Sequence, residues 1–210
     1  MKTIDTLTPA EALQRLVDGN KRFTSGVRSI DSLLSQTKMK ELALNGQRPF
    51  AIVLTCSDSR SPAEMIFDQG VGDLFVVRVA GNVIAPSLLA SIEFAAANFA
   101  SSTIVVLGHT QCGAISATLD HVLHPEKVLP SPHLEELVGR IRPAVESTII
   151  RNRGKESEHK QLATIENIKR SMHLILEQSR IIEGLVKENR ISVEGGLLDI
   201  SSGVVSFFKE

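Results

Sequence analysis

A short apolar run, Phe50-Ala51-Ile52-Val53-Leu54-Thr55, stands about a quarter of the way along this 210-residue chain. The run is continuous rather than alternating and is rich in β-branched residues, which is typical of a strand buried on both faces of a parallel sheet. Two further runs, at residues 74–79 and 103–107, repeat this pattern. The sequence therefore predicts three central strands of one mainly parallel sheet.

Helical patterns separate and follow these strands, at residues 87–99, 114–122, 133–152 and 158–188. Alternation of strands with helices predicts an α/β fold in which right-handed crossovers join the parallel strands and the helices flank the sheet. Residues 191–200 and 204–208 form a closing pair of strand patterns around the turn Ser201-Ser202-Gly203. Because the turn is tight, we expect the last strand to be an antiparallel edge strand.

Two amphipathic helical patterns precede the sheet. The first begins at Thr8-Pro9-Ala10-Glu11, a capping box with proline in the first turn, and is expected to end near Gly19-Asn20. The second covers residues 32–44. We expect a single domain in which residues 1–46 form an N-terminal helical arm and residues 47–210 form the α/β core.

Composition limits the partners of the chain. Its net charge is −1, with 42% apolar and 22% charged residues, so no global field attracts nucleic acid or an anionic membrane. The sequence contains neither the roughly 18 apolar residues of a membrane span nor the apolar run of a signal peptide. We therefore expect a cytoplasmic protein without nucleic-acid or membrane partners.

Both cysteines of the chain follow predicted strands. Cys56 comes directly after the first strand, and His109 and Cys112 come after the third. In parallel sheets ligands bind outside the carboxyl ends of the strands, so these side chains converge if the two strands are neighbours. Two thiolates and one imidazole form a set used for catalytic zinc with a fourth position open, and soft thiolates disfavour magnesium and calcium.

Each of these residues also has an ordinary interpretation. A single cysteine is usually a small core residue, and a single histidine is usually a polar surface group. Two cysteines in a cytoplasmic chain are thiols or metal ligands more often than a structural disulfide. A redox-active disulfide between Cys56 and Cys112 is the alternative to a metal site.

Asp58 can act in two ways. It can supply a fourth, anionic zinc ligand, or it can pair with Arg60 and leave the metal open to water. An ordinary loop salt bridge is the simplest alternative. Zinc makes hydroxide available near neutral pH, and an ionised Asp58 could orient that hydroxide for attack.

Three segments resemble the β-class carbonic anhydrases: residues 56–70, which begin Cys56-Ser57-Asp58-Ser59-Arg60, residues 72–82, and residues 108–114. The N-terminal helix with Asn20-Lys21-Arg22-Phe23 and the closing segment 195–205 match as well, so the resemblance covers nearly the whole chain. It implies reversible hydration of CO₂ to bicarbonate and a proton by zinc-bound hydroxide. It implies zinc ligation by Cys56, His109 and Cys112, with Asp58 and Arg60 gating and orienting the zinc solvent.

The same resemblance implies a substrate pocket and an assembly. Gln69 matches a glutamine that hydrogen-bonds substrate across a dimer interface. Phe75, Ala80 and Phe94 match a small apolar CO₂ pocket, and Gly113 would offer a backbone N–H to an anion. The family implies a homodimer or homotetramer in which the N-terminal helix lies over the neighbour, although docking within one chain fits the sequence equally well.

Some features depart from the family or leave its chemistry open. Phe94 stands where some members of the family have tyrosine, and Leu198 stands where tyrosine is common. A hydrolase of carbon disulfide or carbonyl sulfide needs nearly the same pocket, and a zinc- or redox-sensing protein without turnover is the alternative of another class. The presence of Asp58 and Arg60 favours an enzyme, with His121 or His124 as a candidate proton relay.

Overall fold

The computed structural model describes residues 7–27, 35–154 and 156–209. Its strands are β1 (Ala51–Thr55), β2 (Leu74–Arg78), β3 (Thr103–His109), β4 (Ser192–Leu198) and β5 (Val205–Phe208). Its helices are α1 (Pro9–Thr24), α3 (Gln36–Asn45), α4 (Ala63–Ile66), α5 (Pro86–Asn98), α6 (Gly113–Leu123), α7 (Pro132–Arg151), α8 (His159–Gln178) and α9 (Arg180–Lys187), with short 3-10 helices η1 (Ala80–Asn82) and η2 (Glu156–Glu158).

The five strands form one sheet in the order β2-β1-β3-β4-β5. The first four strands are parallel, and β5 pairs with β4 in the antiparallel direction. In the middle of the sheet Val53 lies opposite both Val76 and Val105. All five residues of β1 are buried, which explains its uninterrupted apolar sequence. The predicted α/β fold with an antiparallel edge strand is confirmed.

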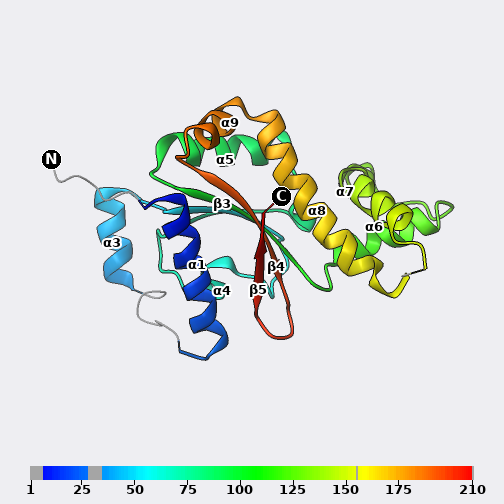
Figure 1. Cartoon of the computed structure of the whole chain (residues 1–210), viewed down its shortest axis with the longest axis horizontal. Helices are drawn as coiled ribbons and strands as arrows, with labels where there is room; N and C mark the ends of the chain where they lie inside the picture. Colours follow the sequence, from blue (N-terminus) through cyan, green and yellow to red (C-terminus); the bar gives the residue numbers. More distant parts are fainter. Residues whose placement is uncertain (1–6, 28–34, 155, 210) are drawn as a thin grey trace.

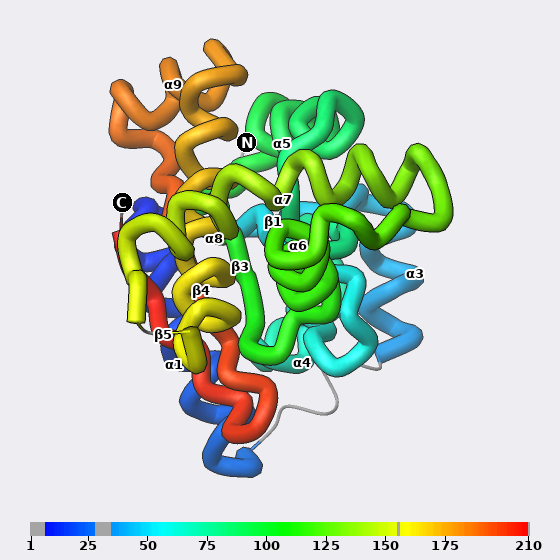
Figure 2. The backbone as a smooth tube through the Cα atoms, turned by 90° about the vertical axis from the view of Figure 1, so that its right-hand side faces the viewer, coloured from blue at the N-terminus to red at the C-terminus, as the bar shows by residue number. Residues whose placement is uncertain are grey.

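Helices cover both faces of the sheet (Figures 1 and 2). Ile104 and Val106 of β3 face one side, where α5, α8 and α9 contribute to the same hydrophobic cluster. Val105 and Leu107 face the other side and pack with α1 and α4. A third cluster joins α6 and α7 to the ends of the strands. The carboxyl ends of β1 and β3 therefore lie beneath α6 and α7.

The first helix is longer than predicted, since α1 continues to Thr24 rather than ending near Gly19-Asn20. Both residues serve contacts with the core instead of ending the helix. A Cβ at position 19 would lie 1.8 Å from the carbonyl oxygen of Phe67, so glycine permits the close approach of two backbones. The side chain of Asn20 donates to the carbonyls of Ile66 and Gly203 and accepts from the N–H of Val205. In this structure α1 is thus docked on its own chain.

The prediction of one long helix over residues 158–188 is wrong in one respect, because the structure has two helices there. Ser179 has an extended backbone (φ −114°, ψ 102°) that ends α8 and caps α9. Its hydroxyl accepts from the N–H of Ile182 and donates to Glu93 on α5. A buried serine cap that bonds another helix turns the chain here, and helical periodicity alone does not reveal it.

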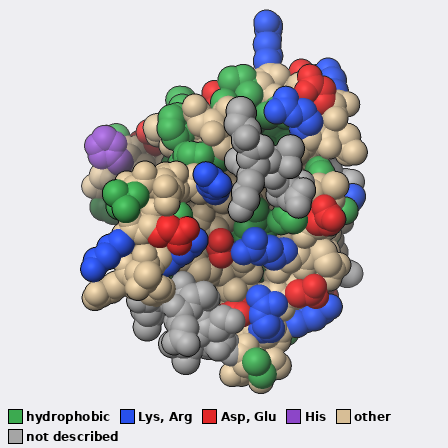
Figure 3. Space-filling model, turned by 90° about the vertical axis from the view of Figure 1, so that its left-hand side faces the viewer, with side chains coloured by type: hydrophobic (Ala, Val, Ile, Leu, Met, Phe, Trp, Pro, Cys, Tyr) green, Lys and Arg blue, Asp and Glu red, His purple; other side chains and the backbone are tan. Residues whose placement is uncertain are grey.

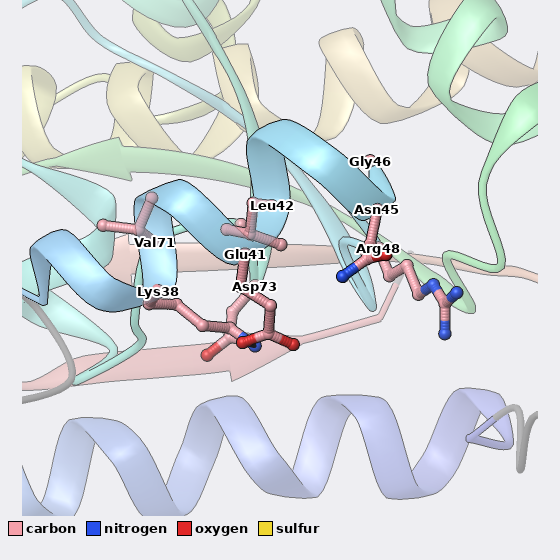
Figure 4. Close-up of a pocket in the computed structure, with 9 residues that line it drawn as sticks. Lys38, Glu41, Leu42, Asn45, Gly46, Arg48, Val71 and Asp73 are labelled. Atoms are coloured by element: carbon pink, nitrogen blue, oxygen red, sulfur yellow. Dashed lines mark hydrogen bonds and ion pairs between the residues drawn. The ribbon is translucent and has the colours of Figure 1, made fainter.

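The second N-terminal helix, α3, lies beside the segment that enters β2 (Figure 4). Of its predicted range, residues 32–34 lie outside the described part of the chain. Leu42 covers Gly72, and a cavity of about 220 Å³ there is lined by charged side chains such as Lys38, Glu41 and Asp73. This cavity is at the amino end of β2, and its lining includes neither cysteine nor histidine.

The exposed surface mixes charges of both signs. Figure 3 shows the face on the left of Figure 1, where Lys and Arg side chains alternate with Asp and Glu and with small apolar areas. Among the helices that the structure describes, none combines the length and apolar character needed to cross a bilayer.

The contacts of Asn20 lead to a stability prediction. Asn20→Ala would leave one buried N–H and two carbonyls without their partner and should lower the free energy of unfolding by about 2–4 kcal/mol, measured by urea denaturation. Gln14→Ala, on the exposed side of the same helix, should change it by less than about 0.5 kcal/mol. Equal effects of the two substitutions would show that α1 is not docked as described.

Candidate metal centre

Three buried side chains meet at the carboxyl ends of β1 and β3. Cys56 follows β1, His109 is the last residue of β3, and Cys112 is the N-cap of α6. Since β1 and β3 are paired neighbours, the predicted convergence is confirmed. One ligand atom from each of the three residues lies within 4.8 Å of the others.

The imidazole of His109 is oriented to act as a ligand. Its Nδ1 lies 2.9 Å from the carbonyl oxygen of Thr110, which fixes the tautomer with the proton on Nδ1. Its Nε2 is buried and has no hydrogen-bond partner among the described residues. Burial lowers the pKa of His109, but the adjacent Cys56 sulfur and the Thr110 carbonyl outweigh burial and raise it. A buried imidazole nitrogen without a partner is the expected state of a metal-ligating histidine.

The two thiols affect one another strongly. Both are free and buried. The contact with Cys112 lowers the pKa of Cys56, and the Cys56 thiolate together with burial raises the pKa of Cys112. Without a cation only one of the two sulfurs can therefore ionise easily. Two thiolates and an imidazole at one point fit zinc, because a divalent cation allows both thiols to lose their protons.

Asp58 and Arg60 form a closely bonded pair beside this group. Arg60 donates to the Asp58 carboxylate from its backbone N–H (2.9 Å), from Nε (2.9 Å) and from Nη2 (2.7 Å). The Arg60 side chain is the main reason why the pKa of Asp58 is well below its usual value. Asp58 Oδ2 also lies 3.9 Å from Nε2 of His109. Asp58 thus borders the ligand group, and in this structure its carboxylate is held by Arg60.

Two further groups support the loop after β1, and sequence reasoning gave them no role of their own. Arg78, at the end of β2, donates to the carbonyls of Cys56 (3.1 Å) and Asp58 (2.7 Å). The N–H of Gly81 points at the Cys56 sulfur at 3.4 Å. The sequence did contain a signal for Arg78, because a charged residue at the end of an otherwise apolar strand indicates a specific contact. No local pattern signals the N–H of Gly81, because its contact depends on the fold.

Two predicted pocket residues lie on segments that border the metal centre. Ala80 precedes Gly81, and a Cβ on Gly81 would lie 3.2 Å from Cβ of Ala114. Gly113 opens α6 directly after Cys112. A Cβ on Gly113 would meet nothing within 4 Å, and the residue is exposed.

The other three predicted pocket residues lie elsewhere in the chain. Gln69 is 2% exposed, accepts a hydrogen bond from Arg15 on α1 and donates to the Phe67 carbonyl. Phe75 pairs with Ile52, four residues before Cys56 along β1. Phe94 lies on α5, and its ring centroid is 6.5 Å from that of Phe75. Within one chain, therefore, Phe75 and Phe94 lie close to each other. These two residues and Gln69 lie apart from the three candidate ligands.

Sequence comparisons associate the chain with one family. The carbonic anhydrase family profile matches residues 51–205. A carbonic anhydrase of Mycolicibacterium smegmatis is 42% identical over 142 residues, which are 65% of this chain and 65% of that protein. Carbonic anhydrase 2 of Mycobacterium tuberculosis is 43% identical over 137 residues, 65% of this chain and 64% of that protein. The matched stretch thus spans just under two thirds of these relatives.

Solved structures agree over a larger part of the chain. The β-carbonic anhydrase CcaA has a TM-score of 0.69 at 27% identity, covering 94% of this chain and 95% of that one. The β-carbonic anhydrase CafA of Aspergillus fumigatus has a TM-score of 0.71 at 25% identity, covering 94% of this chain and 90% of that one.

The geometry of the three ligands leads to a prediction about metal content. The purified protein should contain about one zinc ion per chain, and Cys112→Ser should lose most of it because only two of the three ligands are left. The measurement is metal analysis after dialysis. His124→Ala, which removes an exposed histidine, is the matched control and should keep its zinc. Full zinc in Cys112→Ser would place the metal elsewhere.

The pair of Asp58 and Arg60 leads to a prediction about pH. Because the folded pKa of Asp58 is depressed, the pair stabilises the protein above the ordinary carboxyl pKa of about 3.9, and this contribution is lost only as pH falls through the lower folded value. In metal-free protein, carbon-13 NMR of the Asp58 carboxyl group should show it still ionised at about pH 4, where an ordinary aspartate is about half protonated. Arg60→Ala should raise its pKa. A wild-type midpoint at the ordinary value would contradict the described pairing.

Proposed function

Because this chain belongs to the β-carbonic anhydrase family, we propose that it catalyses the reversible hydration of carbon dioxide to bicarbonate and a proton. Cys56, His109 and Cys112 would hold zinc. The observation that carries the proposal is the convergence of three buried ligand atoms within 4.8 Å, beside a carboxylate held by arginine. A site with three protein ligands rather than four, beside an anion, fits a catalytic zinc better than a purely structural one.

Each group at the site would have a separate role in the reaction. Bound zinc supplies the Lewis acidity that makes hydroxide available from water near neutral pH. Asp58, kept ionised by Arg60, would accept a hydrogen bond from the attacking hydroxide and orient it towards the carbon of CO₂. Arg60 would also keep the Asp58 carboxylate off the metal, so that the fourth ligand position stays open. In this way the pair would both orient the nucleophile and gate the metal.

The product would leave as an anion, and the chain offers one nearby donor for it. Gly113 stands at the start of α6, where backbone N–H groups lack partners within the helix and favour negative charge. Its open surroundings leave room for a bicarbonate oxygen.

The proposed pocket requires a second copy of the chain. Gln69, Phe75 and Phe94 are the residues that the family resemblance assigns to substrate, yet they lie apart from the ligands within one chain. Phe94 is 55% exposed, so its ring is available to a neighbouring copy. We propose that the working form is a homodimer or homotetramer in which a neighbouring copy supplies these residues.

The proposal is tested by stopped-flow measurement of CO₂ hydration at about pH 8, where a carboxylate with a lowered pKa is fully ionised. Asp58→Asn should lower kcat/KM on the order of 10²-fold, since it removes the orienting anion while keeping its shape. The matched control is Asp120→Asn, which changes an exposed carboxylate paired with Lys127 and should leave the rate unchanged.

The same preparation should be assayed for sulfide release from carbon disulfide and carbonyl sulfide. Rapid sulfide release with slow CO₂ hydration would favour the alternative hydrolase. A zinc-loaded protein that accelerates neither reaction would be a binding or sensing protein, and the enzymatic proposal would then be wrong.

A further inference from the structure

The segment Ala80–Asn82 passes directly beside Cys56 in an unusual conformation. Gly81 and Asn82 both have positive φ angles, 69° and 42°. The left-handed region is open to glycine but is unfavourable for most other residues, so this turn needs support from its surroundings. The conformation directs the N–H of Gly81 at the sulfur of Cys56, 3.4 Å away.

Helix α8 supplies that support through two buried polar side chains. Asn167 Nδ2 donates to the Gly81 carbonyl at 2.8 Å, and Ser171 Oγ donates to the Asn82 carbonyl at 2.9 Å. Both side chains are 2% exposed. They lie four residues apart, and therefore on the same side of the helix.

The opposite side of the segment is closed by apolar atoms. A Cβ on Gly81 would lie 2.7 Å from Cδ1 of Ile141 on α7 and 3.2 Å from Cβ of Ala114 on α6. The carbonyl of Gly81, in the peptide unit that follows its N–H, is therefore held by the amide of Asn167, and the Cα of Gly81 is enclosed by side chains of α6 and α7. A rotation about the backbone bonds of Gly81 that turned its N–H away from the sulfur would move the carbonyl away from Asn167 or press the Cα into Ile141.

Asparagine at position 167 is energetically unfavourable in a buried helix unless its side chain has hydrogen-bond partners. Asparagine is a weaker helix former than leucine or methionine, and a buried amide is unfavourable unless it is hydrogen-bonded. Of the buried residues nearby on the same helix, Ile168 and Met172 are apolar and Thr164 and Ser171 are polar. The bond to the Gly81 carbonyl gives the buried amide of Asn167 a partner, so the two groups hold each other in place.

We propose that Asn167 is a positioning residue of the metal centre, which acts through Gly81 on the Cys56 thiolate. An N–H that donates to a thiolate withdraws charge from the sulfur, so the sulfur donates less to a bound cation. Two thiolate ligands weaken the Lewis acidity of zinc, and this hydrogen bond partly restores it. The inference rests on the zinc site proposed above and assigns a tuning role to a residue of α8 that touches neither metal nor substrate.

Cobalt substitution tests the inference without relying on activity. In cobalt-loaded protein, Asn167→Ala should shift the sulfur-to-cobalt charge-transfer band to longer wavelength, because a sulfur without its hydrogen bond gives up charge more easily. The matched control is Ser171→Ala. It removes an equally buried bond to the same turn, but from Asn82, whose N–H donates to the Val79 carbonyl and not to sulfur. Its band should stay at the wild-type position.

A purely structural role predicts the same result for both variants, either no shift or equal shifts, and either result would overturn the inference. A wild-type protein that shows no sulfur-to-cobalt band would refute the zinc site itself, and the inference with it. Zinc-loaded Asn167→Ala should also lose kcat on the order of 10-fold, the usual scale for a residue that supports a metal ligand.

Two further experiments test the inference if Asn167→Ala does not fold. In the first, Asn167→Leu replaces Asn167→Ala in the same comparison, because leucine keeps most of the side-chain volume but lacks the hydrogen-bond donor. In unmodified protein loaded with cadmium-113, the Gly81 amide proton should show a scalar coupling to the metal through the N–H···S bond. Absence of that coupling would contradict the geometry on which the inference depends.

Discussion

Two buried sulfur atoms beside a buried imidazole impose the central constraint on this fold. Cys56, His109 and Cys112 are at most 4% exposed, and one ligand atom from each lies within 4.8 Å of the others. The Cys112 thiol keeps its proton and bonds to the Cys56 sulfur, which lowers the pKa of Cys56, while this contact and burial raise the pKa of Cys112. A divalent cation allows both thiols to lose their protons and gives His109 Nε2 the partner it lacks. The buried arrangement therefore fits a divalent cation.

The surrounding structure places these three atoms with little freedom. Pairing of β1 with β3 brings Cys56 and His109 to one edge of the sheet, and the start of α6 carries Cys112 to the same point. Arg78 holds the loop after β1 through two carbonyls. Asn167 reaches the centre from the opposite side through the turn at Gly81. Strand register thus sets the approximate position of the ligands, and hydrogen bonds from distant segments set their orientation.

Sequence reasoning predicted the approximate position of the ligands but not the hydrogen bonds that orient them. Apolar strand patterns and the positions of two cysteines at strand ends were sufficient to predict the parallel sheet and the three converging ligands, because both depend on local composition and on a general property of parallel sheets. The end of α1 was mispredicted since Gly19 and Asn20 resemble a helix stop, and their real function is contact with residues far along the chain. The same is true of Ser179, which divides α8 from α9 by bonding α5. The separation of Gln69, Phe75 and Phe94 from the three candidate ligands within one chain could not follow from the sequence, because it depends on how distant segments pack.

The account as a whole depends on what surrounds the metal, and X-ray absorption at the zinc edge measures this directly. The protein as purified should show two sulfur ligands at about 2.3 Å and nitrogen or oxygen ligands at about 2.0–2.1 Å. Two sulfurs would place zinc between Cys56 and Cys112, since the chain has no other cysteine. A spectrum with no sulfur in the coordination shell would contradict the central claim.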